Sequence, residues 1–178
     1  MTAASRFHIE TASDAAGRGI AALIAAVFSE YEDCPFVESE FSELAAVSQH
    51  YHALGGEIWI ARCRPEQNVA DPMDGGRIVG CLAIVPTLQD GVFELFKMYV
   101  ARTARGTGLA QRLYGEAERW AAARGMTTIR LWTDTRFAGG HRFYEKSGFA
   151  KQPLIRYLGD AADSWEYLFV SSPQAPSR

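Results

Sequence analysis

The sequence predicts an α/β (α+β) fold in which helices pack against a single sheet. Three observations lead to this fold class. Several short runs alternate apolar and polar residues, which is the pattern of half-buried strands. Other runs place apolar residues three and four apart, as amphipathic helices do. Between residues 94 and 152 the two patterns follow one another, so that this part of the chain is predicted to form a βαβα unit.

The N-terminal half contains two helical patterns and three strand patterns. In chain order they are a strand over Phe7–Thr11, a helix over Ala15–Tyr31, a helix from about Glu40 to His52, and strands over Glu57–Cys63 and Ile78–Pro86. Ser13 or Asp14 is expected to cap the first helix. The polar loop 64–77, rich in Pro, Asp and Gly, is expected to be a mobile connection between two strands.

The C-terminal half repeats this alternation and ends in a polar segment. Its elements are a strand over Glu94–Val100, a helix from about Leu109 that stops at Gly125, a strand over Thr128–Thr133, a short helix within 141–148, a strand over Phe149–Gln152 or Ile155–Leu158, and a strand over Trp165–Val170. We therefore expect one domain over residues 1–170. The polar, proline-bearing segment 171–178 is expected to be a disordered tail.

A glycine-punctuated turn joins the strand ending at Val100 to the helix beginning at Leu109. Gly106 and Gly108 lack Cβ, so their backbone can approach a bulky anion closely. The first N–H groups of the helix have no intrahelical partner, and the helix dipole adds partial positive charge there. Arg105 adds a full charge. These features predict a site for a phosphate or diphosphate at residues 105–110.

Three motifs in this order resemble the GNAT superfamily of acetyl-coenzyme A-dependent N-acetyltransferases. They are the strand Glu94–Val100, the R-x-x-G-x-A pattern as Arg105-x-x-Gly108-x-Ala110, and Phe143-Tyr144-Glu145-Lys146-x-Gly148-Phe149, together within residues 77–152. The resemblance implies a mixed, mostly antiparallel sheet of six to seven strands, splayed in the middle and flanked by about four helices. It also implies acetyl-CoA as co-substrate, with no metal.

The resemblance implies a coenzyme site made largely of main chain. Its residues would be Met98, Tyr99, Val100, Arg105, Gly106, Thr107, Gly108, Leu109 and Ala110. The amides of residues 105–110 would bind the diphosphate, and the pantetheine arm would pair with Met98–Val100 as an added strand would. The amide of Val100 or Met98 would donate to the thioester oxygen.

Three side chains are candidates for proton transfer. Tyr144 matches the family's usual acid and would protonate the departing thiolate. The alternative interpretation is a tyrosine packed between a helix and a sheet, which would give the same sequence pattern. Glu94 is the leading base, acting directly or through water, with a solvated strand residue as the alternative interpretation and water alone as another candidate base. Asp134 is the second candidate base, because it ends the next strand.

The chain departs from the family's pattern at one place. Many relatives carry an asparagine after the strand that precedes the short helix and an alanine three residues on, whereas Phe137 and Gly140 stand here. The amide contact to the coenzyme is therefore absent, or replaced by Arg136, His141 or a backbone group.

The acceptor is expected to bind to the segment between the first strand and Glu57. Acidic residues surround Cys34-Pro35-Phe36 there: Glu30, Glu32, Asp33, Glu38, Glu40 and Glu43. An acidic rim with aromatic residues suits a cationic amine. The alternative interpretation is a solvated helix face, which has the same composition. The predicted function is transfer of an acetyl group to a primary amine, on a small molecule or a peptide, by direct attack in a ternary complex. A non-catalytic acyl-CoA-binding or antitoxin-type module is the alternative.

Composition excludes several other classes. The net charge of −3 offers no basic footprint for nucleic acid, and no apolar run reaches the length of about 20 residues that crosses a membrane. Since no signal-peptide pattern precedes Phe7, a cytoplasmic protein is expected. Cys34, Cys63 and Cys81 lack the spacing of a disulfide framework or a zinc site, and Cys63 and Cys81 are expected in the core. A homodimer remains open.

Overall fold

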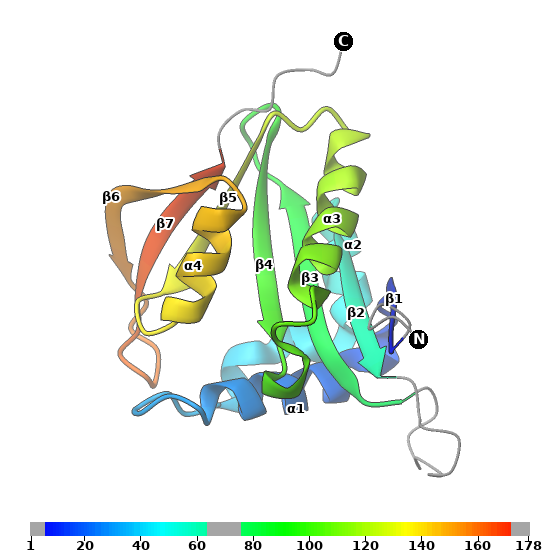
Figure 1. Ribbon diagram of the computed structural model, residues 1–178, viewed down its shortest axis with the longest axis vertical. Coiled ribbons are helices and arrows are strands. Elements are labelled where there is room, and N and C mark those ends of the chain that lie inside the picture. The colour runs from blue at the N-terminus through cyan, green and yellow to red at the C-terminus, as the bar shows by residue number, and fades with distance from the viewer. Residues whose placement is uncertain (1–5, 64–75, 172–178) are drawn as a thin grey trace.

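A computed structural model describes residues 6–63 and 76–171 and contains one seven-stranded sheet in the order β1-β2-β3-β4-β5-β7-β6 (Figure 1). The strands are β1 (Phe7–Thr11), β2 (Glu57–Cys63), β3 (Ile78–Pro86), β4 (Val92–Val100), β5 (Thr128–Asp134), β6 (Phe149–Tyr157) and β7 (Trp165–Ser171). All neighbouring strands are antiparallel except β4 and β5, which are parallel. The predicted mixed, mostly antiparallel sheet is confirmed.

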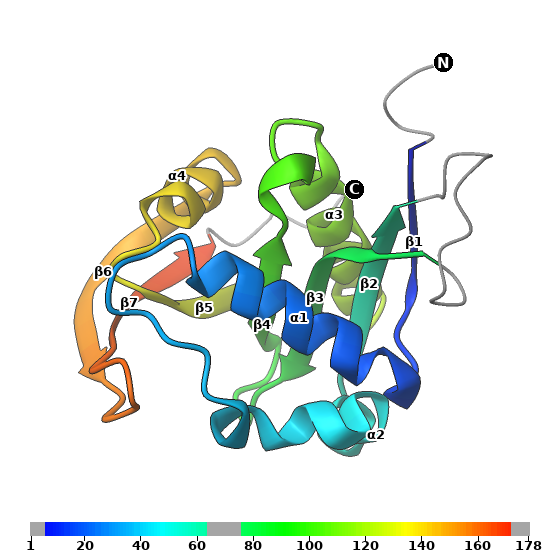
Figure 2. The ribbon, with the colours of Figure 1, turned by 90° about the horizontal axis from the view of Figure 1, so that it is seen from below.

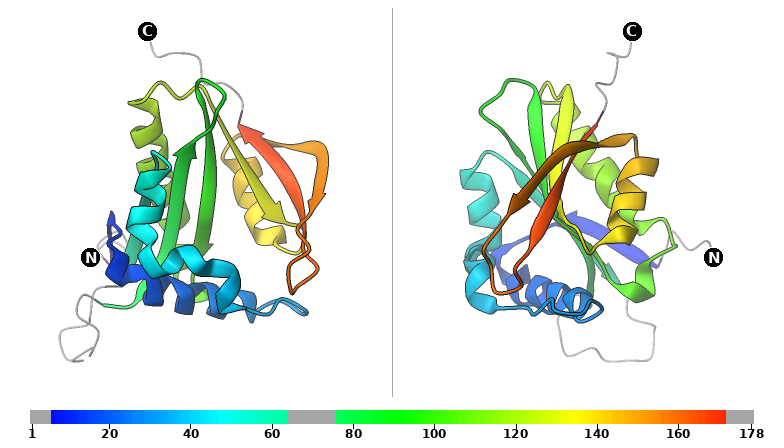
Figure 3. Two further views of the ribbon diagram at one scale, coloured as in Figure 1. Left: turned by 180° about the vertical axis from the view of Figure 1, so that it is seen from behind. Right: turned by 90° about the vertical axis from the view of Figure 1, so that its left-hand side faces the viewer.

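Four α-helices occur in the described residues. They are α1 (Gly17–Phe28), α2 (Val47–Ala53), α3 (Leu109–Ala122) and α4 (Ala138–Lys146), with short 3-10 helices η2 (Asp14–Ala16), η3 (Glu38–Ala46) and η4 (Arg102–Ala104). Figures 2 and 3 show α3 and α4 on one face of the sheet and α1 and α2 on the other. Trp120 of α3 packs edge-on against Trp59 of β2 and Phe93 of β4, which joins this helix to the centre of the sheet.

The sheet opens between its two central strands. Ladder pairing of β4 with β5 covers only Val92–Leu95 opposite Thr128–Leu131, although both strands continue beyond it. Below this point in Figure 1 the two strands diverge. The second half of β4 therefore presents one unpaired edge, as the predicted splay requires.

A bulge in β4 lies beside the opening. Three residue steps from Phe96 to Tyr99 face two steps from Ala83 to Cys81 on β3, so β4 carries one extra residue. Lys97 has a φ of 53°, and its carbonyl accepts a hydrogen bond from the Cys81 thiol at 3.0 Å. A bulge of this kind redirects the strand and changes which groups face the gap.

Two local predictions are corrected. The helix expected over about Glu40 to His52 is divided into η3 and α2, because the backbone of Phe41 leaves helical geometry at φ −124° and ψ 42°. Asp14 does not cap the first helix; its carboxylate accepts the amides of Ser48 and Gln49 at 2.8 and 3.1 Å, so it caps α2. A carboxylate close to two unpaired amides of a helix N-terminus is stabilised there, whichever segment carries it.

The C-terminal part also differs from expectation. The two alternative strands after Gly148 are one strand, β6, with a register irregularity between Lys151 and Ile155. Ser171 ends β7, and its hydroxyl accepts the amide of Ile129 at 2.8 Å. The remaining tail residues 172–178, and residues 64–75 of the expected loop, lie outside the described residues. Among the helices of the described residues, none has the length and apolar character to span a bilayer.

Candidate active site

The turn before α3 has the geometry that the two glycines predict. Gly106 and Gly108 adopt φ values of 74° and 81°, in the left-handed region. A Cβ at either position would meet no atom within 4 Å, so backbone torsion rather than space calls for glycine there. The first α3 hydrogen bond runs from the Arg112 amide to the Gly108 carbonyl at 3.1 Å. The helix's earlier amides therefore have no intrahelical acceptor.

A cavity of about 430 Å³ extends from this turn to the end of β4 and to α4. Eight of the nine predicted coenzyme residues line it: Met98, Tyr99, Val100, Arg105, Gly106, Gly108, Leu109 and Ala110. Thr107 does not line it, because its side chain turns back and its hydroxyl donates to the Ala104 carbonyl at 2.7 Å. We call this space the donor cavity.

Arg105 is not a free charge in this structure. Its guanidinium donates two hydrogen bonds to the Glu30 carboxylate, at 2.6 and 2.8 Å, and its Nε donates to the Val100 carbonyl at 3.0 Å. The sequence pattern shows the basic residue but not the acidic partner, which lies 75 residues away. The positive character of the turn therefore comes mainly from main-chain amides and the α3 dipole.

One amide of β4 points into the gap. The Ala101 amide donates to the Val79 carbonyl of β3 at 2.8 Å, and successive N–H groups of a regular strand point to opposite edges. The amide of Val100 therefore faces away from β3, toward the opening. Val100 lines the donor cavity, so this group is available to a carbonyl of a ligand. Met98 lines the cavity too, but it lies in the bulge, where this alternation does not apply.

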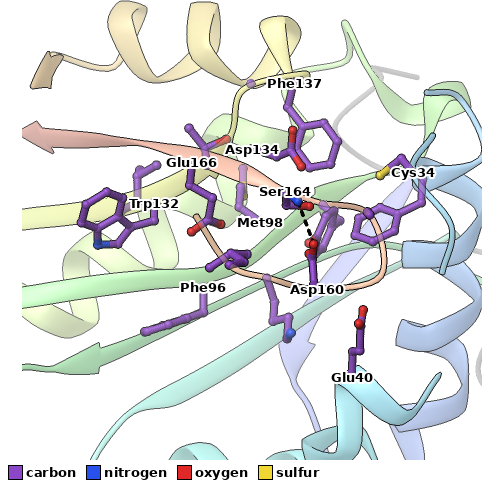
Figure 4. Close-up of a pocket in the computed structure, with 18 of the residues that line it drawn as sticks. Cys34, Glu40, Phe96, Met98, Trp132, Asp134, Phe137, Asp160, Ser164 and Glu166 are labelled. Atoms are coloured by element: carbon purple, nitrogen blue, oxygen red, sulfur yellow. Dashed lines mark hydrogen bonds between the residues drawn. The ribbon is translucent and has the colours of Figure 1, made fainter. Parts of the chain in front are cut away.

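A second cavity, of about 520 Å³, lies across the opening (Figure 4). Its aromatic wall consists of Phe28, Phe41, Phe96, Tyr99, Trp132 and Phe137. Phe28, at the end of α1, joins several of these rings, with centroid distances of 5.9 Å to Phe41, Tyr99 and Phe137. The predicted acceptor segment contributes Cys34, Pro35 and Glu40 as well. We call this space the acceptor cavity.

The two cavities meet at the opening of the sheet. They share Met98, Tyr99, Phe137, Gly140 and Tyr144. Tyr144 comes from α4 and its ring packs against Phe149 and Phe169, at 5.8 and 5.9 Å between centroids. Burial raises the pKa of Tyr144 above its ordinary value of 10.0, so its phenol keeps its proton at neutral pH and can donate it.

The two predicted bases lie in different places. Asp134 lines the acceptor cavity, whereas Glu94 lines neither cavity and its carboxylate is held by Arg130 Nε at 2.7 Å. Arg136 holds both oxygens of Asp134, with 2.9 Å from its Nε to Oδ1 and a second bond from its Nη2 to Oδ2. Burial would raise the pKa of Asp134, but the hydrogen bonds from Arg136 outweigh it and lower that pKa.

Arg136 also ties the walls of the acceptor cavity together. Its guanidinium donates to the carbonyls of Asp33 and Ala162 and, at 2.7 Å, to the Ser164 hydroxyl. It therefore joins the end of β5 to the segment after α1 and to the turn between β6 and β7. This residue was predicted only as a substitute for the missing asparagine contact, and it does not line the donor cavity.

Phe137, in place of the family's asparagine, lines both cavities, and its ring packs at a tilt against Tyr31, at 4.8 Å between centroids. His141 turns away from the coenzyme side: its Nε2 lies 2.9 Å from the Asp134 carbonyl and its ring stacks on Phe169. An aromatic contact thus replaces a polar one at the junction of the cavities.

Glu166 is a site residue that the sequence reasoning missed. It lies on β7 opposite Asp134 of β5 and lines the acceptor cavity. Its Oε2 accepts a hydrogen bond from Arg156 Nε at 2.6 Å. The sequence shows only a polar residue in a closing strand. Its place at the site depends on β7 pairing with β5, which no local pattern predicts.

The splayed sheet and the two joined cavities could hold an acyl donor beside an acceptor, the arrangement that an acyltransferase needs. The chain belongs to the acetyltransferase (GNAT) family, whose family model matches residues 24–149. It is 37% identical over 99 residues to a protein of Azospirillum brasilense named IAA acetyltransferase, over 55% of this chain. That alignment spans 62% of the relative's own length.

Solved structures of low sequence identity share the fold. An acetyltransferase of the GNAT family from Staphylococcus aureus Mu50 has a TM-score of 0.73 and 17% identity, covering 93% of this chain and 98% of that one. An acetyltransferase from Streptococcus agalactiae 2603 has a TM-score of 0.73 and 20% identity, covering 94% and 98%. An IAA acetyltransferase from Bacillus cereus ATCC 14579 has a TM-score of 0.60 and 16% identity, covering 93% and 98%.

Proposed function

We propose that the protein is an N-acetyltransferase that moves the acetyl group of acetyl-CoA to a primary amine in a ternary complex. The observation that carries this proposal is the meeting of the donor and acceptor cavities at the opening between β4 and β5, with Tyr144 lining both. Two substrates entering from opposite faces of the sheet would place the thioester and the amine next to one another, which removes much of the entropic barrier to their reaction.

In the proposed complex, the amides of the turn and of the first turn of α3 bind the diphosphate. The main chain of Met98–Val100 holds the pantetheine arm, and the Val100 amide, which faces the gap, donates to the thioester oxygen. A preorganised donor to that oxygen is worth several kcal/mol in a dry site. The Arg105 guanidinium stabilises the turn through its two hydrogen bonds to the Glu30 carboxylate.

The chemical step is a nucleophilic attack on the thioester carbonyl. The amine nitrogen forms the C–N bond, the C–S bond breaks, and the thiolate takes a proton from the Tyr144 hydroxyl. The nitrogen loses the corresponding proton, which restores the phenol, so the products are the amide and free coenzyme A. The Tyr144 phenol is neutral at pH 7 and lines both cavities, so it carries the proton that the thiolate takes.

An acyl-enzyme is disfavoured by the cysteines. Cys81 is buried, and burial raises the pKa of its thiol to about 12. Cys34 lines the acceptor cavity, but burial raises its pKa too, so neither thiol is a thiolate at neutral pH. Cys63 ends β2, half-buried and away from both cavities. Direct transfer needs none of them.

The acceptor cavity favours a cationic amine. Carboxylates of Glu40, Asp134, Asp160 and Glu166 line it beside the aromatic wall. Lys97 also lines it, but its Nζ is paired with Glu43 at 2.6 Å and lies 4.4 Å from the centre of the Phe41 ring. Aromatic faces and carboxylates both attract an ammonium group. The compound in the name of the Azospirillum relative, IAA, is a second acceptor to assay.

The test combines turnover with binding. Purified protein is incubated with acetyl-CoA and a panel of primary amines, peptides and IAA, and release of free thiol is followed while a thermal melt reports coenzyme binding. Amine-dependent thiol release with stabilisation by acetyl-CoA supports the proposal. Stabilisation without release from any acceptor favours the non-catalytic acyl-CoA-binding module. If acetyl-CoA neither stabilises the protein nor releases thiol, both interpretations are wrong.

A further inference from the structure

We propose that Glu166 is the proton acceptor for the ammonium group of the acceptor, in place of Glu94 and Asp134. This inference rests on the proposed function, because it names the residue that prepares the amine for attack. Glu166 lies on β7 in the acceptor cavity, and its side chain is 15% exposed. In Figure 4 its carboxylate is turned toward the interior of this cavity.

Glu166 forms part of a row of charges across three strands. The register of β7 sets it opposite Asp134 on β5 and opposite Arg156 on β6. Arg156 reaches only Oε2, through its Nε at 2.6 Å, and its own side chain is 42% exposed. Among the described residues, none donates a hydrogen bond to Oε1. That oxygen remains for a ligand in the cavity.

The other two carboxylates are less suited to accept a proton. Both oxygens of Asp134 are held by the Arg136 side chain, and Oδ1 also accepts the Arg136 amide at 2.8 Å. Glu94 lies at the paired end of β4, outside both cavities, and is held by Arg130. A base must first be within reach of the proton it removes, and Glu94 is not in contact with the cavity.

Two more carboxylates, Glu40 and Asp160, line the acceptor cavity, and both are held by the turn between β6 and β7. Glu40 Oε1 accepts the Ala161 amide at 2.8 Å, and Asp160 Oδ1 accepts the Ser164 amide at 2.7 Å, so both are tied to the turn between β6 and β7. Glu166 is not tied to that turn: its side chain's one hydrogen bond among the described residues comes from Arg156 of β6.

The environment of Glu166 also tunes it toward this role. Burial raises its pKa above the ordinary value of 4.5, the hydrogen bond from Arg156 opposes this, and the charges of Asp134 and Asp160 add to the rise. A carboxylate with a raised pKa holds a proton from an ammonium more readily near neutral pH. The proton passes to Glu166, leaving the amine lone pair free, and is later released to water.

The first experiment compares Glu166→Gln with the wild type across pH, using the amine that gives the fastest wild-type thiol release, beginning with 2-phenylethylamine. We expect kcat at pH 7 to fall by roughly 100-fold, with no change in stabilisation by acetyl-CoA. The deficit should shrink as pH rises, because more of the amine is deprotonated in solution and needs no base. Glu116→Gln, on α3 and outside both cavities, is the matched control and should keep the wild-type profile; Glu116 is half-buried and paired with Arg119, as Glu166 is paired with Arg156.

The second experiment follows the side-chain carboxyl of Glu166 by 13C NMR in the folded wild type, with Glu166→Gln identifying the signal. We expect its midpoint above the ordinary glutamate value of 4.5. A lower midpoint overturns the proposal, as does wild-type kcat at pH 7 in Glu166→Gln or a deficit that pH does not change. A pH-rescued loss in Glu94→Gln alone assigns the role to Glu94. If the wild type acetylates no acceptor, the proposed function itself fails and this assignment with it.

Discussion

Glu30 and Arg105 form a two-point ion pair that joins the segment after α1 to the turn before α3, with nitrogen–oxygen distances of 2.6 and 2.8 Å. The segment after α1 borders the acceptor cavity and the turn borders the donor cavity. The pair therefore connects the walls of two cavities through residues that are distant in sequence. It also neutralises the charge that the turn would otherwise present to a diphosphate.

This pairing predicts non-additive effects on coenzyme affinity. Arg105→Gln leaves Glu30 uncompensated beside the diphosphate site, so KM for acetyl-CoA should rise about two- to fivefold, the range of a partly exposed charge pair. In the double variant with Glu30→Gln, most of that rise should disappear, because the repulsive charge is gone. Steady-state kinetics with varied acetyl-CoA provide the measurement. Equal KM values in the single and double variants would contradict this explanation.

Tyr144→Phe should lower kcat by about 100-fold, because the thiolate then leaves without a proton donor. The ring stays packed against Phe149 and Phe169, so KM for acetyl-CoA and the melting temperature should remain close to those of the wild type. Thiol release and a thermal melt on the same preparation check both points. A variant with normal kcat removes Tyr144 from the mechanism.

Gly108→Ala should destabilise the fold by about 1 kcal/mol and raise KM for acetyl-CoA. Its φ of 81° is unfavourable for alanine, and the amides of the turn must shift to relieve the strain. Gly115→Ala is the matched control within α3, where a Cβ also meets no atom within 4 Å. There alanine should stabilise the helix by about 0.5–1 kcal/mol. Denaturant unfolding of both variants measures the contrast, and equal signs would contradict it.

Asp134→Asn should lose stability at neutral pH by about 1–2 kcal/mol, because the Arg136 guanidinium loses a charged partner. The pKa of Asp134 is lower in the folded state than its ordinary value of 3.8, so its contribution is complete above that value and is lost as pH falls through the folded pKa. The difference between wild type and variant should therefore shrink below about pH 4. Unfolding free energies from pH 3 to 7 test this, and a constant difference would exclude the linkage.

Much of the fold could be predicted from local patterns. The bounds of β1, β2 and β3 match the predicted strands, and α3 begins at the predicted Leu109, because alternation, amphipathic spacing and a glycine turn are carried by neighbouring residues. The division of η3 from α2 was missed, since Phe41 leaves helical geometry without a proline or glycine to mark the break. Eight of the nine predicted coenzyme residues line the donor cavity for a similar reason, since they fall within two short stretches of the sequence.

The acceptor side could not be predicted in the same way. Its charged residues come from segments that meet only when β7 inserts between β5 and β6, and their partners are far away in sequence. Whether an arginine holds one or both oxygens of a carboxylate, and whether that carboxylate lines a cavity, depends on strand order and register. In the sequence, Glu94, Asp134 and Glu166 are three acidic residues in strands, and only the fold distinguishes their positions.

The sequence by itself determined the family, the donor turn and the identity of Tyr144 as a candidate acid, because each is written in a short contiguous motif. The tertiary structure decided the pairing of Arg105, the enclosure of the acceptor cavity by Arg136, and the position of Glu166. Charges interact through space over a few ångströms, and only the folded chain brings their carriers within that distance.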